Sequence, residues 1–150
     1  ALMEKLVAEL AGAPYRFIVS KGPQHSEYEL ADNMAGEEFL PQVKVLPEVD
    51  LVITHGGNNT VTESLYFGKP MVVAPIFWDQ HDNAQRVQET GLGRRLDTYQ
   101  HSGEELLGAI EELLGDRKLA NRLAKISARL QANPGNSLAA DLIERVASEG

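Results

Sequence analysis

The sequence contains no cysteine among its 150 residues, which excludes disulfide bonds, thiolate metal ligands and cysteine nucleophiles. It also lacks any run of about 18 apolar residues, so no membrane-spanning segment is predicted. The N-terminus shows no charged-then-apolar signal pattern. Together with the absence of cysteine, this leads us to expect a cytoplasmic protein.

Positive charge is scarce, because 14 Lys and Arg residues face 22 Asp and Glu residues, for a net charge of −8. This balance argues against a nucleic-acid partner, whose phosphates need Lys and Arg contacts. Any anionic ligand must therefore be held by a local site and not by the overall field. The hydrophobic content of 43% is enough for a core and too high for a disordered chain.

Helical and strand patterns alternate along the chain. Leu2, Leu6 and Leu10 recur at helical spacing and predict a helix over residues 1–11. The runs 50–54 and 70–74 are continuously apolar, which is typical of strands buried on both faces of a parallel sheet. Other predicted strands lie at 15–20, near 37–40 and at 93–96, with a polar loop over 21–33. Further helices are predicted over 58–67, 80–90, 103–114, 116–131 and 137–148.

This alternation predicts an α/β fold, namely a doubly wound, Rossmann-like parallel sheet with helices on both faces. Such a domain normally opens with its central strand, whereas this sequence opens with a helix. We therefore expect the first strand to be missing from this sequence. Residues 1–131 form the predicted ligand-binding domain, and residues 132–150 a linker and C-terminal helix.

The segment after the run 50–54 has the features of an anion site. His55 follows the strand, Gly56-Gly57 allow a close backbone approach, and a helix is predicted to begin near Asn58. Free N–H groups and the helix dipole favour an anion there, by ~0.3–1 kcal/mol per charge. The side chains of His55, Asn58, Asn59 and Thr60 add neutral hydrogen-bond donors. In the competing structural interpretation, the glycines form a plain tight turn and Asn58 or Thr60 caps the helix.

Three further candidates have structural alternatives of their own. Glu63 alone would be a solvated helix residue, Phe39 a core residue, and Asp79-Gln80 a helix cap. However, His55, the helix after it and Asp79-Gln80 all follow predicted strands, and ligands bind at the carboxyl ends of strands in such sheets. This common location favours a binding site.

Four motifs in this region resemble a known family. They are F-x-P-Q from Phe39, H-x-G-x-N-T-x-x-E from His55, G-x-P from Gly68 and P-x-x-x-D-Q from Pro75. Together they are similar to the sugar-donor signature of GT-B fold nucleotide-sugar glycosyltransferases. The THGGNN wording and the WDQxxNAxR run resemble the bacterial macrolide and natural-product branch, which is related to plant and animal UDP-glycosyltransferases. The likeness covers the C-terminal half of such an enzyme.

The resemblance implies a role for each matching residue. Phe39 would stack on the pyrimidine, Gln42 would contact the ribose, and the backbone of Val43 would bind the base edge. Glu63 would accept hydrogen bonds from the ribose hydroxyls. The implied diphosphate contacts are His55, Gly57, Asn59 and Thr60, and the implied sugar contacts are Trp78, Asp79 and Gln80. Asn58 departs from the family pattern and joins the predicted nucleotide contacts as a neutral hydrogen-bond donor.

The resemblance also implies the reaction. A hexose would move from a UDP- or TDP-sugar to a hydroxyl of a small-molecule acceptor, with inversion and without a metal. The nucleotide sugar is a co-substrate, so no cofactor and no metal ligand are predicted.

The family's catalytic His lies in an N-terminal acceptor domain, so we expect no catalytic residue in this chain and no activity from it alone. The alternative is a sugar-nucleotide-binding subunit that needs a separate acceptor-domain chain. Asn58 replaces the Trp of plant members, which leaves uridine and thymidine both open.

Overall fold

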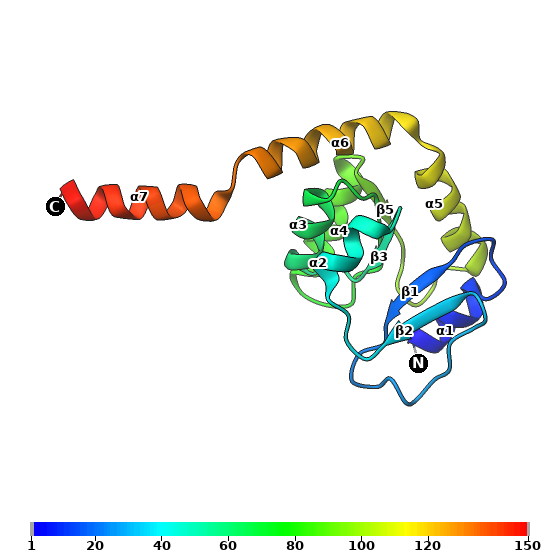
Figure 1. Cartoon of the computed structure of the whole chain (residues 1–150). Coiled ribbons are helices and arrows are strands. Elements are labelled where there is room, and N and C mark those ends of the chain that lie inside the picture. The colour runs from blue at the N-terminus through cyan, green and yellow to red at the C-terminus, as the bar shows by residue number, and fades with distance from the viewer. Residues whose placement is uncertain (1, 150) are drawn as a thin grey trace.

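The computed structural model describes residues 2–149, in which helices and strands alternate (Figure 1). The first half contains α1 (Leu2–Leu10), β1 (Phe17–Ser20), β2 (Met34–Glu37), α2 (Gln42–Val45), the 3-10 helix η1 (Leu46–Glu48), β3 (Val52–Thr54) and α3 (Asn58–Tyr66). The second half contains β4 (Met71–Val73), α4 (Asp79–Glu89), β5 (Gly93–Arg95), α5 (Gly103–Gly115), α6 (Arg117–Ala132) and α7 (Gly135–Glu149).

All strand pairs are parallel, as the alternating pattern predicts. β1 pairs with β2 in one ladder, and β3, β4 and β5 form a second ladder in that order. The predicted α/β class is confirmed. The two ladders are not joined by hydrogen bonds into one continuous sheet. Within residues 2–149, no strand pairs with both β1 and β3.

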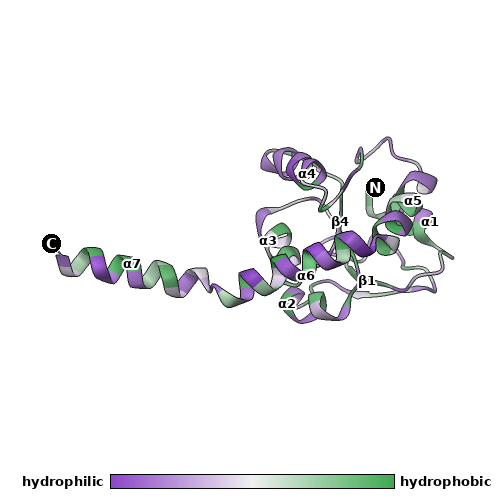
Figure 2. Cartoon of the chain, turned by 90° about the horizontal axis from the view of Figure 1, so that it is seen from above, coloured by the Kyte–Doolittle hydropathy of each residue, from purple (hydrophilic) through white to green (hydrophobic). Residues whose placement is uncertain are grey.

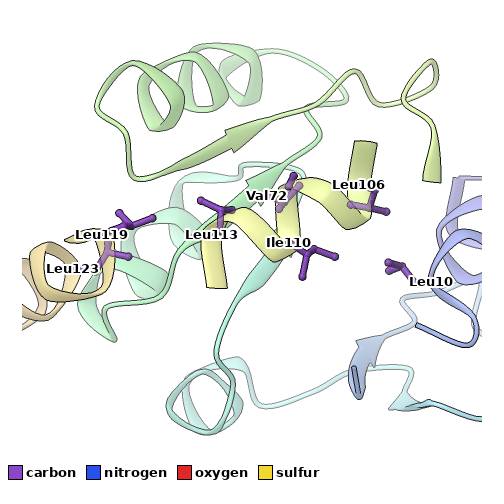
Figure 3. Close-up of a cluster of buried hydrophobic side chains, with 8 residues drawn as sticks. Leu10, Val72, Leu106, Ile110, Leu113, Leu119 and Leu123 are labelled. Carbon is purple, nitrogen blue, oxygen red and sulfur yellow. The ribbon is translucent and has the colours of Figure 1, made fainter. Parts of the chain in front are cut away.

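The central strand β4 shows why the sheet is covered on both faces. Successive side chains of a strand point to opposite faces. Val72 packs in a cluster with α1, α5 and α6, where it lies near Ile110 and Leu113 (Figure 3). Met71 and Val73 pack on the other face, in a cluster with residues of α4. Both faces of β4 are therefore packed, as the continuous apolar run 70–74 predicts.

Helix α1 is fastened to the segment between β5 and α5. Nε2 of the buried His101 lies 2.9 Å from Oε2 of Glu9, and its Nδ1 lies 2.6 Å from the carbonyl oxygen of Asp97. Nζ of Lys5 donates to the carbonyl oxygen of His101 at 2.7 Å. The side chain of Asp97 accepts from the backbone N–H groups of Gln100 and Tyr99, which lowers its pKa. These contacts hold the loop after β5 in place.

Some predicted boundaries are wrong. The brief run expected near residues 37–40 is the strand β2, at Met34–Glu37, and the chain turns helical from Gln42. Met-Ala-Gly-Glu has too little apolar periodicity to be recognised as a strand. On α6, Leu119 and Leu123 are buried, whereas Leu130 is 37% exposed.

Helix α7 projects away from the rest of the chain (Figure 1), and none of its residues is buried. Apolar and polar residues alternate along it (Figure 2). None of the helices within the described range is long and apolar enough to cross a membrane.

Candidate functional site

The carboxyl ends of β3, β4 and β5 lie at one edge of the second ladder, because the three strands are parallel. His55 follows β3, and residues 74–78 follow β4. The loop after β5 is tied to this edge, since Oγ1 of Thr98 donates to the carbonyl oxygen of Pro75 at 2.5 Å. The segments predicted to form the site therefore gather at one edge.

Both glycines of the turn between β3 and α3 lie close to neighbouring side chains. Gly56 has a φ of 89°, and a Cβ there would lie 2.8 Å from Cγ1 of Val73. A Cβ on Gly57 would lie 2.8 Å from Nε2 of His55. The imidazole of His55 therefore lies against the backbone of Gly57, and a larger residue at position 57 would displace this ring.

A hollow of 310 Å³ lies at this turn, lined by His55, Gly57, Asn58, Asn59 and Thr60. All five are predicted nucleotide contacts. The N-cap residue of α3 is Gly57, and no side chain caps the helix, so the structural interpretation of Asn58 or Thr60 as the cap is wrong. The first N–H groups of α3 have no acceptor within the helix. The hollow therefore offers neutral N–H and hydroxyl donors, and among the described residues that line it there is no lysine or arginine.

Helix α2 brings Gln42 against α3. Nε2 of Gln42 donates to Oε2 of Glu63 at 2.5 Å and lies 3.3 Å from Oγ1 of Thr60. Glu63 and Gln42, the two residues implied in ribose binding, are thus in direct contact beside the hollow. Phe39 and Val43, which flank Gln42 in the sequence, are 69% and 54% exposed. The interpretation of Phe39 as a core residue is therefore wrong, and its ring is free to stack on a ligand.

The Trp78-Asp79-Gln80 segment opens α4. Trp78 is 84% exposed and holds a φ of 51°, a strained value for a residue with a side chain. Asp79 is exposed in the first turn of α4, and no side chain caps this helix, so Asp79-Gln80 is not a helix cap.

Gln80 is buried, and its Oε1 accepts from the backbone N–H groups of Ile76 and Phe77 at 2.9 and 3.2 Å. Its carbonyl oxygen thus stabilises the loop that ends at Trp78. In the part of the chain that the structure describes, no hydrogen bond engages its amide nitrogen, so only that nitrogen is available to a ligand.

Asn83 of α4 also belongs to the site, although sequence reasoning gave it no role. Its Nδ2 donates to the carbonyl oxygen of Gly56 at 2.8 Å and to Oδ1 of Asn58 at 2.9 Å. The only signal in the sequence is its place in the WDQxxNAxR run. A polar residue on a polar helix otherwise indicates a solvated face.

The fold and the turn place the chain in the Rossmann-like class found in GT-B glycosyltransferases. The family described as UDP-glucoronosyl and UDP-glucosyl transferase matches residues 5–140. The chain belongs to this family, which confirms the resemblance seen in the motifs.

Individual proteins show the same similarity. The oleandomycin glycosyltransferase of Streptomyces antibioticus is 35% identical over 116 residues, which is 77% of this chain and 27% of that protein. The zeaxanthin glucosyltransferase of Pseudescherichia vulneris is 39% identical over 107 residues, 71% of this chain and 26% of that protein. The crystal structure of a kitacinnamycin glycotransferase superposes with a TM-score of 0.87 at 36% identity, covering 96% of this chain and 38% of that one. The chain thus spans only a fraction of the length of its relatives.

Proposed function

We propose that residues 1–131 form the sugar-donor-binding domain of a glycosyltransferase, with residues 132–150 as a linker and C-terminal helix. The enzyme would transfer a hexose from a UDP- or TDP-sugar to a hydroxyl of a small-molecule acceptor. The observation that carries this proposal is the contact of Gln42 with Glu63 and Thr60, directly beside the hollow at the start of α3. Family membership and relatives named for the glycosylation of oleandomycin and zeaxanthin support it.

The nucleoside would lie over α2. The exposed ring of Phe39 would stack on the pyrimidine, while the carboxylate of Glu63 would accept hydrogen bonds from the ribose hydroxyls. Gln42 already donates to that carboxylate, so it would hold Glu63 in place or share the ribose with it. The backbone of Val43 would bind the base edge.

The diphosphate would occupy the hollow at the turn. His55, Asn58, Asn59, Thr60 and the backbone of Gly57 would donate to its oxygens. The leaving nucleoside diphosphate gains negative charge in the transition state, and donors fixed in advance stabilise that charge. This arrangement would serve in the inverting, metal-independent transfer that the family resemblance implies.

The hexose would extend toward the start of α4. Asp79 would accept from its hydroxyls, the amide nitrogen of Gln80 would donate to one of them, and the indole of Trp78 would cover the sugar. No residue of this chain is assigned as the catalytic base. That base would come from an acceptor domain in the same protein, or from a separate acceptor-domain chain if this chain is a binding subunit.

A thermal-shift panel of UDP, TDP and their sugars, followed by calorimetry, tests the proposal on this chain. We expect UDP or TDP to bind and to raise the midpoint of unfolding, whereas adenosine and guanosine diphosphates do not. The folded chain is also expected to transfer no sugar to a hydroxylated acceptor by itself. If neither UDP nor TDP binds, the proposed function is wrong.

A further inference from the structure

Asn83 connects the turn at Gly56 to the helix that begins at Asp79. Its side-chain nitrogen has two hydrogens, and both are used: one on the carbonyl oxygen of Gly56 at 2.8 Å and one on Oδ1 of Asn58 at 2.9 Å. A backbone carbonyl can only accept, so this partner fixes which end of the Asn83 amide faces the turn. The half-buried position of Asn83 keeps the side chain in this orientation.

The first hydrogen bond sets the direction of the Gly56–Gly57 peptide. In a planar trans peptide, the C=O and N–H groups point in opposite directions. Since the carbonyl of Gly56 points to α4, the N–H of Gly57 points away from α4. The hollow has no lining residue from α4 and is lined by Gly57 itself. Within the described residues, this N–H group donates to no backbone acceptor, so it is free for a ligand in the hollow.

The second hydrogen bond sets the direction of the Asn58 amide. Because Oδ1 of Asn58 accepts from Asn83, its acceptor end is turned away from the hollow and its NH₂ group is left free. An anion needs donors and is repelled by carbonyl oxygens. Without Asn83, the Asn58 amide could rotate and present oxygen to the ligand.

We propose that Asn83 is a positioning residue that orients the backbone N–H of Gly57 and the amide of Asn58 toward the diphosphate of a nucleotide sugar. It touches neither the ligand nor the reacting atoms and acts through the two groups it binds. The inference rests on the proposed function, because it assumes that a diphosphate occupies the hollow.

Calorimetry of UDP and TDP, with uridine and thymidine beside them, tests this role in Asn83→Ala. We expect the affinity for the diphosphate that binds wild type to fall by about 5- to 10-fold, the effect of one to two neutral hydrogen bonds. Nucleoside affinity should change by less than about twofold, because the nucleoside does not reach the turn. Asn83→Leu keeps the shape of the side chain without a donor, and it is measured instead if the alanine variant does not fold.

Gln85→Ala is the matched control on the same helix. The amide of Gln85 contacts Glu89 and Arg95 and does not reach the turn, so nucleotide binding should match wild type. An equal loss for diphosphate and nucleoside in the Asn83 variants, or no loss at all, would overturn the positioning role. If wild type itself binds no UDP or TDP, the proposed function fails as well, so the two failures are distinguishable.

Discussion

Gln42 donates through Nε2 to Oε2 of Glu63 at 2.5 Å, and this contact joins α2 to α3 across 21 positions of sequence. Glu63 is half-buried, and its carboxylate has no cation against it in the described chain. A carboxylate held by a neutral amide keeps lone pairs free for other donors. The pair is therefore prepared to receive vicinal hydroxyls.

Replacing this carboxylate tests the ribose assignment. In Glu63→Gln, we expect the affinity for UDP to fall by about 10- to 100-fold, because a hydrogen bond to a charged group contributes ~1.5–3 kcal/mol. The loss should be smaller for 2′-deoxy-UDP, which offers only the 3′-hydroxyl. Calorimetry measures both, with Glu89→Gln on α4 as the control. Equal losses for the two nucleotides would argue against a contact with the 2′-hydroxyl.

The ring of His55 lies against the turn and is expected to bind phosphate. His55→Ala should weaken UDP binding by about 3- to 10-fold, the effect of one hydrogen bond, and leave uridine binding nearly unchanged. Titrations of the two ligands measure the difference. His81→Ala, an exposed histidine of α4 that faces Arg95, serves as the control. If uridine binding falls as much as UDP binding, His55 has no specific phosphate role.

The sequence predicts the parts of this site that are local along the chain. His55, Gly57 and Thr60 lie within six residues, so a strand, a glycine turn and a helix start already define the hollow. The contact of Asn83 with Gly56 spans 27 positions and depends on how α4 packs beside the turn. No periodicity encodes such a contact, which is why Asn83 was missed.

The same distinction holds for the fold. The continuous apolar run at β4 predicts that other elements pack on both faces of this strand. Its side chains point alternately to the two faces, and all of them are buried. The pairing of strands is not encoded in this way, and the sequence could not predict that they form two ladders. The short helix α2 was also missed, since four residues are too few to show a helical period.

The two glycines of the turn should respond differently to alanine. Gly56→Ala places a Cβ at 2.8 Å from Val73 and at a φ of 89°, so we expect a loss of ~1–3 kcal/mol in the free energy of unfolding. Gly57 has a φ of −61°, which alanine adopts freely, and the three atoms nearest to its Cβ would all belong to the ring of His55.

Gly57→Ala should therefore keep the stability of wild type and lose UDP affinity, because the imidazole must move. Urea unfolding and calorimetry on the same two variants separate the effects. A Gly57→Ala protein that binds UDP like wild type would show that the position of the His55 ring does not matter. A stable Gly56→Ala protein would show that the turn relaxes.

Gln80 is expected to have two roles, one for each polar atom of its side chain. Its oxygen holds the loop before α4, and its amide nitrogen is proposed to contact the sugar. Gln80→Glu keeps an oxygen for the N–H groups of Ile76 and Phe77, which also stabilise the charge, but it removes the free amide nitrogen. We expect the midpoint of thermal unfolding to stay within about 3 °C of wild type. Affinity for the preferred nucleotide sugar should fall about 3- to 10-fold relative to its nucleoside diphosphate.

Gln88→Glu is a matched control for this substitution. Oε1 of Gln88 also accepts from a backbone N–H group, that of Arg95, but the residue lies two turns further along α4. The same change of amide to carboxylate there should leave binding of the nucleotide sugar unaltered. If both variants bind it as wild type does, the amide nitrogen of Gln80 does not contact the hexose. Gln80 would then act only through its carbonyl oxygen, as the acceptor that holds the loop before Trp78.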